Sequence, residues 1–154
     1  DIKAVSFVGS NTAGEYIYKT ASNHGKRAQV NMGAKNHSIV MPDCEKDDAI
    51  NNLIGACFGS TGQRCMSISV VVLVGETHKW VPEIVEKAKT LKVGPGHENF
   101  DIAPLNNAAH LKNVERLIAD GEKNATLLLD GRGVKVEGYP NGNWVGPTII
   151  DNCK

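Results

Sequence analysis

Apolar runs of strand length alternate with amphipathic stretches of helical length along this chain. Short apolar runs predict strands, and apolar residues at three- and four-residue spacing predict helices. Strands are expected over residues 4–8, 27–32, 38–41, 68–74, 126–129 and 144–150. Helices are expected over residues 12–24, 43–59, 80–91 and 106–120, the last of them ending at Gly121. This alternation predicts an α/β fold, with a layered, mostly parallel sheet and flanking helices.

The run Ile68–Val74 is the strongest strand signal, because it is nearly continuous in β-branched residues. Such a run is typical of a strand that is buried on both faces of a parallel sheet. Acidic residues within 43–48 suit the first turn of the helix that follows them, through its dipole. Residues 131–143 are polar and are expected to form a hairpin-like excursion.

Composition narrows the class of protein. The chain has 154 residues, 41% hydrophobic and 22% charged, as in a globular domain with its own core. Its 17 basic and 17 acidic residues argue against a nucleic-acid or anionic-membrane surface. No apolar run reaches membrane-spanning length and the start is no signal peptide, so we expect neither a membrane protein nor a secreted one. Strand-like runs at both ends suggest a piece cut from a longer chain.

The cysteines and histidines form no metal-binding pattern. The four cysteines at positions 44, 57, 65 and 153 match neither a zinc spacing nor a Cys-x-x-Cys pair. The five histidines show no His-x-x-x-His or His-Glu pattern, so no metal site is expected. We interpret the cysteines as reduced thiols in a reducing compartment, with Cys57 on the apolar face of a helix and therefore in the core.

The segment Gly59–Met66 is the main candidate for chemistry. Cys65 follows a run of small, turn-forming residues and directly precedes the strongest strand, where a thiol can be both held in place and exposed. Arg64 beside it provides a positive charge that favours the thiolate. The alternative is that Cys65 is one more small buried hydrophobe.

A second candidate lies at the first strand-to-helix turn. Gly9–Gly14 connects the strand over 4–8 to the following helix, and such turns present backbone N–H groups to phosphate. Its spacing matches neither a P-loop nor Gly-x-Gly-x-x-Gly. Phosphate binding and an ordinary βα turn are equally consistent with it.

Three segments taken together resemble the aldehyde dehydrogenase superfamily. They are Phe7–Ser10, Asn31–Asn36 and Gly62–Cys65, which correspond to that family's Phe-Thr-Gly-Ser, Glu-Leu-Gly-Gly-Lys and Gly-Gln-x-Cys stretches. Asn31 precedes Cys65 by 34 residues, the interval between the family's glutamate and its cysteine, and Gly146–Thr148 matches a later motif. The resemblance implies a partial catalytic domain over residues 1–154. Residues 1 to about 30 would then end the NAD-binding region, with the flanking parts of the enzyme absent.

The resemblance assigns Cys65 as the nucleophile, forming a thiohemiacetal and then a thioester, but the family's glutamate is Asn31 here. An amide is no base near neutral pH, so it cannot activate water. A thiol is partly ionised without a base and is the natural acyl acceptor. These features resemble the CoA-acylating branch, which forms propionyl-CoA or acetyl-CoA from methylmalonate or malonate semialdehyde with NAD, coenzyme A being a co-substrate.

The resemblance also implies binding roles. Gly9 and Ser10 would lie near the NAD pyrophosphate, and Met32 and Gly33 beside the nicotinamide, whereas Gly14 is better explained by close helix packing. Arg64 would bind the substrate carboxylate. Thiolate stabilisation or a surface salt bridge remains open for Arg64.

Further expectations follow for the whole enzyme. It would be a homo-oligomer acting on a small-molecule semialdehyde, in the mitochondrial matrix if eukaryotic and in the cytoplasm if bacterial. The 154 residues alone should have little or no dehydrogenase activity. Two alternatives stay open, namely a hydrolytic aldehyde dehydrogenase with another base and a non-catalytic α/β module.

Overall fold

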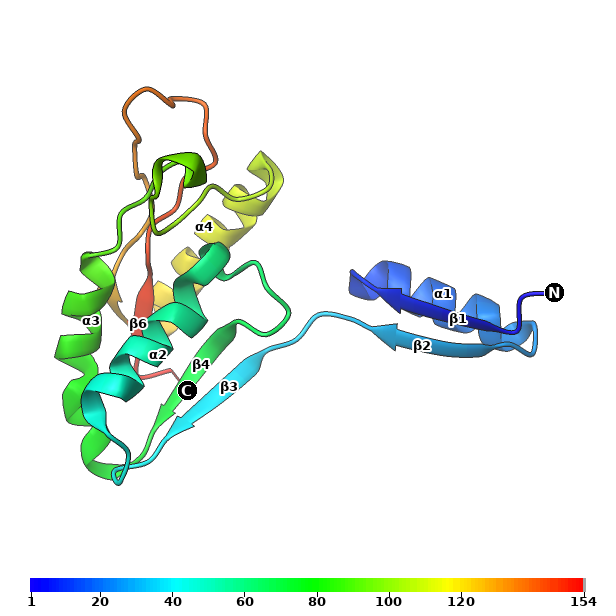
Figure 1. The fold of residues 1–154 in the computed structure, drawn as a ribbon, viewed down its shortest axis with the longest axis horizontal. Coiled ribbons are helices and arrows are strands. Elements are labelled where there is room, and N and C mark those ends of the chain that lie inside the picture. The colour runs from blue at the N-terminus through cyan, green and yellow to red at the C-terminus, as the bar shows by residue number, and fades with distance from the viewer. Residues whose placement is uncertain (154) are drawn as a thin grey trace. The chain divides into compact units, whose positions relative to one another are not determined.

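A computed structural model describes residues 1–153 as two compact units. Residues 1–35 form the first unit, and the chain from Asn36 onward forms the second (Figure 1). Both units contain helices and parallel strand pairs, so the predicted α/β class is confirmed. Within the described residues, no helix combines the length and the apolar character needed to cross a membrane.

The first unit is a strand–helix–strand motif. Strand β1 (Ala4–Val8) leads into helix α1 (Asn11–Asn23), which returns to strand β2 (Arg27–Asn31). The two strands are parallel, in register from Ala4 opposite Arg27 to Val8 opposite Asn31. These elements match the predicted ones to within a residue at each end.

Helix α1 begins at a side-chain cap and packs through a glycine. The Ser10 hydroxyl accepts a hydrogen bond from the N–H of Ala13 at 3.3 Å, which satisfies one of the free amides of the first turn. Gly14 is buried, and a Cβ there would lie 2.6 Å from the Met32 side chain. Close helix packing therefore explains Gly14, as the sequence predicts.

The second unit contains four strands and three α-helices among its described residues, with short 3-10 turns between them. These are β3 (Asn36–Val40), α2 (Lys46–Phe58), β4 (Ile68–Leu73), α3 (Val81–Lys89), α4 (Ala108–Asn124), β5 (Thr126–Leu129) and β6 (Ile149–Asp151). Strands β3 and β4 are parallel neighbours, whereas β5 and β6 are antiparallel. The 3-10 turns are Gly59–Gly62, Gly75–Trp80 and Gly96–Glu98.

Helix α2 supplies much of the core of this unit. The Glu45 side chain caps it by accepting from the N–H groups of Asp47 and Asp48, so the acidic first turn is as predicted. Its residues Ile50 and Ile54 are buried in one cluster with Ala88 of α3. A second cluster joins Leu105, Ile118 and Val145 under α4.

Strand β4 differs from its prediction. Within the described residues it hydrogen-bonds to β3 alone. The side chain of Val72 in β4 is 42% exposed, and that of Ile39 in β3 is 67% exposed. The prediction that this strand is buried on both faces is therefore wrong for the chain described here. A run of β-branched residues shows that a strand can be covered on both faces, but the covering layer must be supplied by other segments.

Helix α4 also runs further than predicted. It continues through Gly121 to Asn124, although a glycine in a helical pattern often marks its end. A Cβ at position 121 would lie 2.7 Å from Cδ1 of Ile150 in β6, so this glycine lets the helix approach the strand. Gly121 is therefore a packing residue and not a helix stop.

The segments before β6 form an irregular layer. Only Ile149 and Ile150 of the predicted strand over 144–150 lie in β6 (Ile149–Asp151), and residues 131–143 form a loop without a hairpin ladder. Trp144 is nonetheless buried, and its indole N–H donates to the Tyr139 carbonyl at 2.9 Å. Burial of Trp144 and its hydrogen bond to Tyr139 therefore hold this segment, which lacks the hydrogen-bond ladder of a strand.

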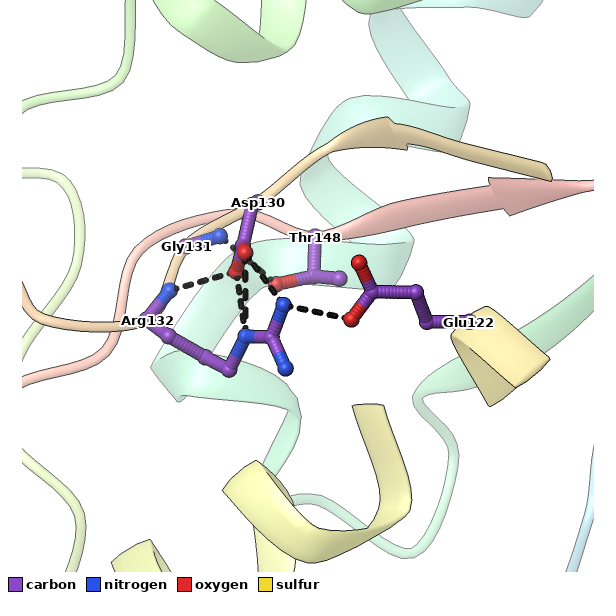
Figure 2. Close-up of polar contacts among 5 residues, drawn as sticks. All are labelled: Glu122, Asp130, Gly131, Arg132 and Thr148. Atoms are coloured by element: carbon purple, nitrogen blue, oxygen red, sulfur yellow. Dashed lines mark hydrogen bonds and ion pairs between the residues drawn. The ribbon is translucent and has the colours of Figure 1, made fainter. Parts of the chain in front are cut away.

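An arginine ties the loop after β5 to the end of α4 (Figure 2). The Arg132 guanidinium donates to both carboxylate oxygens of Asp130 and, at 2.8 Å, to Glu122. These bonds hold the pKa of the Asp130 carboxyl below its ordinary value, hydrogen bonding to Arg132 being the main cause. Next to it, the Gly131 N–H donates to Thr148 Oγ1 at 3.0 Å, so two different contacts fix the loop.

We expect Gly131→Ala to destabilise the protein by about 3 kcal/mol. An added Cβ would lie 2.0 Å from the carbonyl oxygen of Gly146, and the N–H of Gly146 donates to the Gly131 carbonyl at 2.7 Å. The backbone therefore cannot move away without losing that bond.

Gly55→Ala in α2 is the matched control for this change. A Cβ at position 55 meets no atom within 4 Å, so alanine should stabilise the helix by about 0.5–1 kcal/mol. Urea denaturation of the two purified variants measures both effects. Equal stability of the two variants would contradict the packing described here.

Candidate active site

The turn that precedes Cys65 has an unusual backbone. Ser60, Thr61 and Gly62 have φ angles of 53°, 56° and 69°, so three consecutive residues are left-handed. Only glycine adopts this region without cost, and the two other residues cost about 1–2 kcal/mol each. Backbone strain of this kind is concentrated at functional sites.

Long-range hydrogen bonds hold this turn. The Thr61 hydroxyl donates to the Ala103 carbonyl at 2.5 Å. The Gln63 side chain accepts from the N–H of Asn106 at 3.0 Å and donates to the Ser60 carbonyl at 3.3 Å. The turn is therefore fastened both to itself and to a segment about 40 residues away.

Arg64 fastens the other side of the turn to helix α2. Its Nη2 group donates to the carbonyls of Gly55 and Ala56 at 2.8 and 3.0 Å, and its Nε donates to Ser67 Oγ at 3.2 Å. A cation at a helix C-terminus is favourable because the last carbonyls carry partial negative charge. The guanidinium passes over Gly59, where a Cβ would lie 2.8 Å from Nη2.

The two nearby cysteines lie in different environments. Cys65 is exposed, as are Cys44 and Cys153, whereas Cys57 is half-buried. Burial raises the pKa of the Cys57 thiol, and the positive charge of Arg64 opposes this shift. Cys57 is therefore only partly buried on α2, where a core position was predicted. Cys65 is a thiol that a reagent can reach.

An asparagine contacts the backbone of the Cys65 segment directly. The side-chain amide of Asn36, at the start of β3, donates to the carbonyl of Cys65 and to that of Ser67, both at 2.8 Å. Asn36 is half-buried and Ser67 is 5% exposed. The backbone that carries the thiol is therefore held at positions 65 and 67 by one side chain.

The first unit gathers the other predicted site residues at one end. The Gly9 N–H donates to the Asn31 carbonyl at 3.1 Å, and the Gly33 N–H donates to Oδ1 of Asn11 at 2.8 Å. These residues follow the carboxyl ends of β1 and β2, with Ser10 at the start of α1. Ligands of parallel α/β folds commonly bind at this edge.

Close contacts explain the glycines at this edge. A Cβ at Gly9 would lie 2.5 Å from the Phe7 ring, and one at Gly33 would lie 3.1 Å from Oδ1 of Asn11. Asn31 is exposed, and Met32 is 40% exposed beside Gly14. The edge therefore presents exposed backbone, a serine hydroxyl and an asparagine amide.

The structure thus collects the predicted residues into two groups. Gly9, Ser10, Asn31, Met32 and Gly33 lie in the first unit, and the pair of residues 64 and 65 lies in the second. Because Asn31 and Cys65 belong to different units, their pairing stays a prediction. The roles assigned to single residues also stay predictions.

Sequence analysis assigned no role to three side chains that the structure brings into the site. They are Asn11, Asn36 and Gln63. Asn36 and Gln63 lie within the segments that carried the family resemblance, so the motif was a usable signal for both. Asn11 has no sequence signal beyond its place in the first turn of α1. Within residues 1–153, no group of three or more His, Cys, Asp or Glu side chains could hold a metal ion.

The chain was compared with known proteins. A family model described as the aldehyde dehydrogenase family matches residues 1–154. The mitochondrial acylating methylmalonate-semialdehyde/malonate-semialdehyde dehydrogenase of Bos taurus is 57% identical over 156 residues, which cover 100% of this chain and 29% of the bovine protein. The human enzyme of the same name is 58% identical, with the same coverage.

A solved structure is similar to this chain in both sequence and fold. It is a Sinorhizobium meliloti 1021 protein assigned as a methylmalonate-semialdehyde dehydrogenase and complexed with NAD. It matches with a TM-score of 0.91 and 45% identity, covering 97% of this chain and 31% of that one. The chain thus spans less than a third of the length of the relatives it matches.

The left-handed turn yields a test by substitution. Ser60→Gly should raise the free energy of unfolding by about 0.5–1 kcal/mol, because relief of the left-handed strain exceeds the added flexibility of the unfolded chain. Ser60→Val should lower it by about 1–2 kcal/mol, since a β-branched residue fits this region least. Urea denaturation measures the free energy of unfolding of both variants. A valine variant as stable as the parent would rule out a left-handed conformation at Ser60.

Proposed function

The chain belongs to the aldehyde dehydrogenase family, and we propose that the full-length protein containing it is an NAD-dependent, CoA-acylating methylmalonate/malonate-semialdehyde dehydrogenase. The bovine and human proteins that carry this name are 57% and 58% identical to it, in alignments that cover the whole chain. The observation that carries the proposal is Cys65, an exposed thiol that follows a left-handed turn held by long-range hydrogen bonds. A nucleophile needs both exposure and a fixed position.

Cys65 attacks the aldehyde carbonyl as its thiolate. Addition gives a thiohemiacetal, and loss of a hydride converts this to a thioester on the same sulfur. The Arg64 charge lies next to the thiol in sequence, and its Nε and Nη2 groups hold the loop. We assign its Nη1 group, which none of these bonds uses, to the substrate carboxylate, where a planar guanidinium is well suited.

The residues of the first unit fit a dinucleotide. Gly9 is exposed just before the start of α1, and Ser10 adds a hydroxyl at the same point. We assign these two residues to the pyrophosphate of NAD, and Met32 and Gly33 to the nicotinamide side of the site. When bound, NAD accepts the hydride that leaves the thiohemiacetal.

Asn31 determines the acyl acceptor in this proposal. It is exposed at the end of β2 and stands where the family has its glutamate. Since its amide cannot remove a proton from water, the thioester is released to coenzyme A, whose thiol ionises without help. For malonate semialdehyde the acyl group also loses its carboxylate as CO2, a proton taking its place on carbon, so the products are acetyl-CoA, CO2 and NADH.

Assembly and location follow from the family. We propose that the full-length protein is a homo-oligomer acting on a small-molecule semialdehyde. Its mammalian relatives are named as mitochondrial, which supports the mitochondrial matrix for a eukaryotic source. A bacterial source would place it in the cytoplasm.

Alkylation distinguishes this enzyme from a non-catalytic module. In the full-length protein at pH 7, iodoacetamide should label Cys65 faster than Cys44, Cys57 and Cys153, although three of the four are exposed. Cys57 should react slowest, because burial raises its pKa and lowers its thiolate fraction until the pH rises through that value. Trypsin cleaves after Arg64, so mass spectrometry reads Cys57 and Cys65 in separate peptides. Uniform, slow labelling would favour the non-catalytic module.

The acyl acceptor is tested with Asn31→Glu. The full-length parent should form NADH from malonate semialdehyde only when CoA is present. The glutamate variant should gain CoA-independent turnover and release free acid, since a carboxylate can activate water. Cys65→Ala is the control and should abolish both activities. Free acid from the parent without CoA would instead favour the hydrolytic dehydrogenase.

A further inference from the structure

Asn36 makes two hydrogen bonds that the proposed chemistry does not use. Its Nδ2 atom carries two hydrogens and lies 2.8 Å from the carbonyl oxygens of both Cys65 and Ser67. The three residues come from β3 and from the segment before β4, which are 29 to 31 positions apart in the chain. Both donors of one amide therefore hold the backbone that carries the candidate nucleophile.

The strand pairing explains why a side chain is needed here. Asn36 pairs with Ile68, but His37 pairs with Val70, so the ladder between β3 and β4 has a bulge between these two positions. The segment before β4 turns back at this point, with the Ser67 N–H donating to the Arg64 carbonyl at 3.1 Å. Carbonyls at a bulge or turn need partners from outside the regular ladder. Asn36 provides them for positions 65 and 67.

We propose that Asn36 is a positioning residue for the Cys65 thiol, an inference that rests on the proposed role of Cys65 as nucleophile. A hydrogen bond to the Cys65 carbonyl fixes the ψ angle of that residue and with it the direction of its Cα–Cβ bond. The second bond, to Ser67, prevents the segment from rotating about the first. Misplacement of a reacting atom by about 1 Å can cost a hundredfold in rate.

Arg64 alone cannot supply this constraint. Within the part of the chain that the structure describes, its side chain donates to Ser67 Oγ and to the carbonyls of Gly55 and Ala56, and not to the backbone of Cys65.

 Its bonds end at the side chain of Ser67, so the Cys65 carbonyl depends on Asn36. Two side chains thus hold the loop: Arg64 binds the end of α2, and Asn36 binds the carbonyls of Cys65 and Ser67.

The test compares substitutions at Asn36 in the full-length protein. Asn36→Asp keeps the shape but replaces the donors with acceptors, whereas Asn36→Ser keeps a single donor. Asn124→Asp is the matched control, because it makes the same change on α4, where the Asn124 amide donates to the Asp120 carbonyl. The measurements are kcat and KM for malonate semialdehyde with CoA and NAD, thermal unfolding, and the iodoacetamide labelling rates of Cys65 and Cys44.

We expect kcat to fall about tenfold to a hundredfold in Asn36→Asp, with KM within about twofold, and to recover in part in Asn36→Ser. The labelling rate of Cys65 should change while that of Cys44 does not, and Asn124→Asp should match the parent. If Asn36→Asp does not fold, Asn36→Ser decides the question by the same readouts.

Two other outcomes have distinct meanings. A lower unfolding temperature with kcat and Cys65 labelling within about twofold of the parent would overturn the inference, because Asn36 would then act on stability alone. A parent that forms no NADH with CoA would refute the proposed function instead. In that case the labelling rate of Cys65 relative to Cys44 still decides whether Asn36 positions the thiol.

Discussion

The left-handed turn at Ser60–Gly62 is the constraint on which the candidate site depends. Its two non-glycine residues cost about 2–4 kcal/mol together, so the turn persists only because other contacts hold it. Thr61 and Gln63 bind the segment near Ala103, and Arg64 binds the end of α2. At about 1 kcal/mol for each bond, and more for those of a guanidinium, these contacts offset a strain of that size. The exposed thiol is therefore a product of the surrounding fold.

Small residues let the elements approach one another where the chain needs it. In the first unit the Met32 side chain packs directly against Gly14, and in the second the Ile150 side chain packs directly against Gly121. Gly59 does the same for the Arg64 guanidinium, which could not reach the carbonyls of α2 across a larger residue. These three glycines allow close packing, and Gly59 also ends α2 as its C-cap.

The elements were predictable from periodicity, but their surroundings were not. Amphipathic spacing located α1 and α2 closely, whereas Gly121 and the exposed face of β4 depend on which segments pack there. The family motif located Cys65, yet the bonds from Asn36 span 29 to 31 residues and have no periodic signal. Tertiary contacts of this range lie outside what local patterns encode.

The absence of a base at position 31 has two consequences under the proposed function. An amide cannot deprotonate water, so the step that would hydrolyse the thioester lacks its general base. For the same reason the thioester on Cys65 would persist until a nucleophile arrives that is partly ionised without a base. Coenzyme A meets this condition, because a thiol needs less help than water near neutral pH. Under the proposed function, a single exposed asparagine at the end of β2 would thus both slow the competing reaction and leave time for acyl transfer.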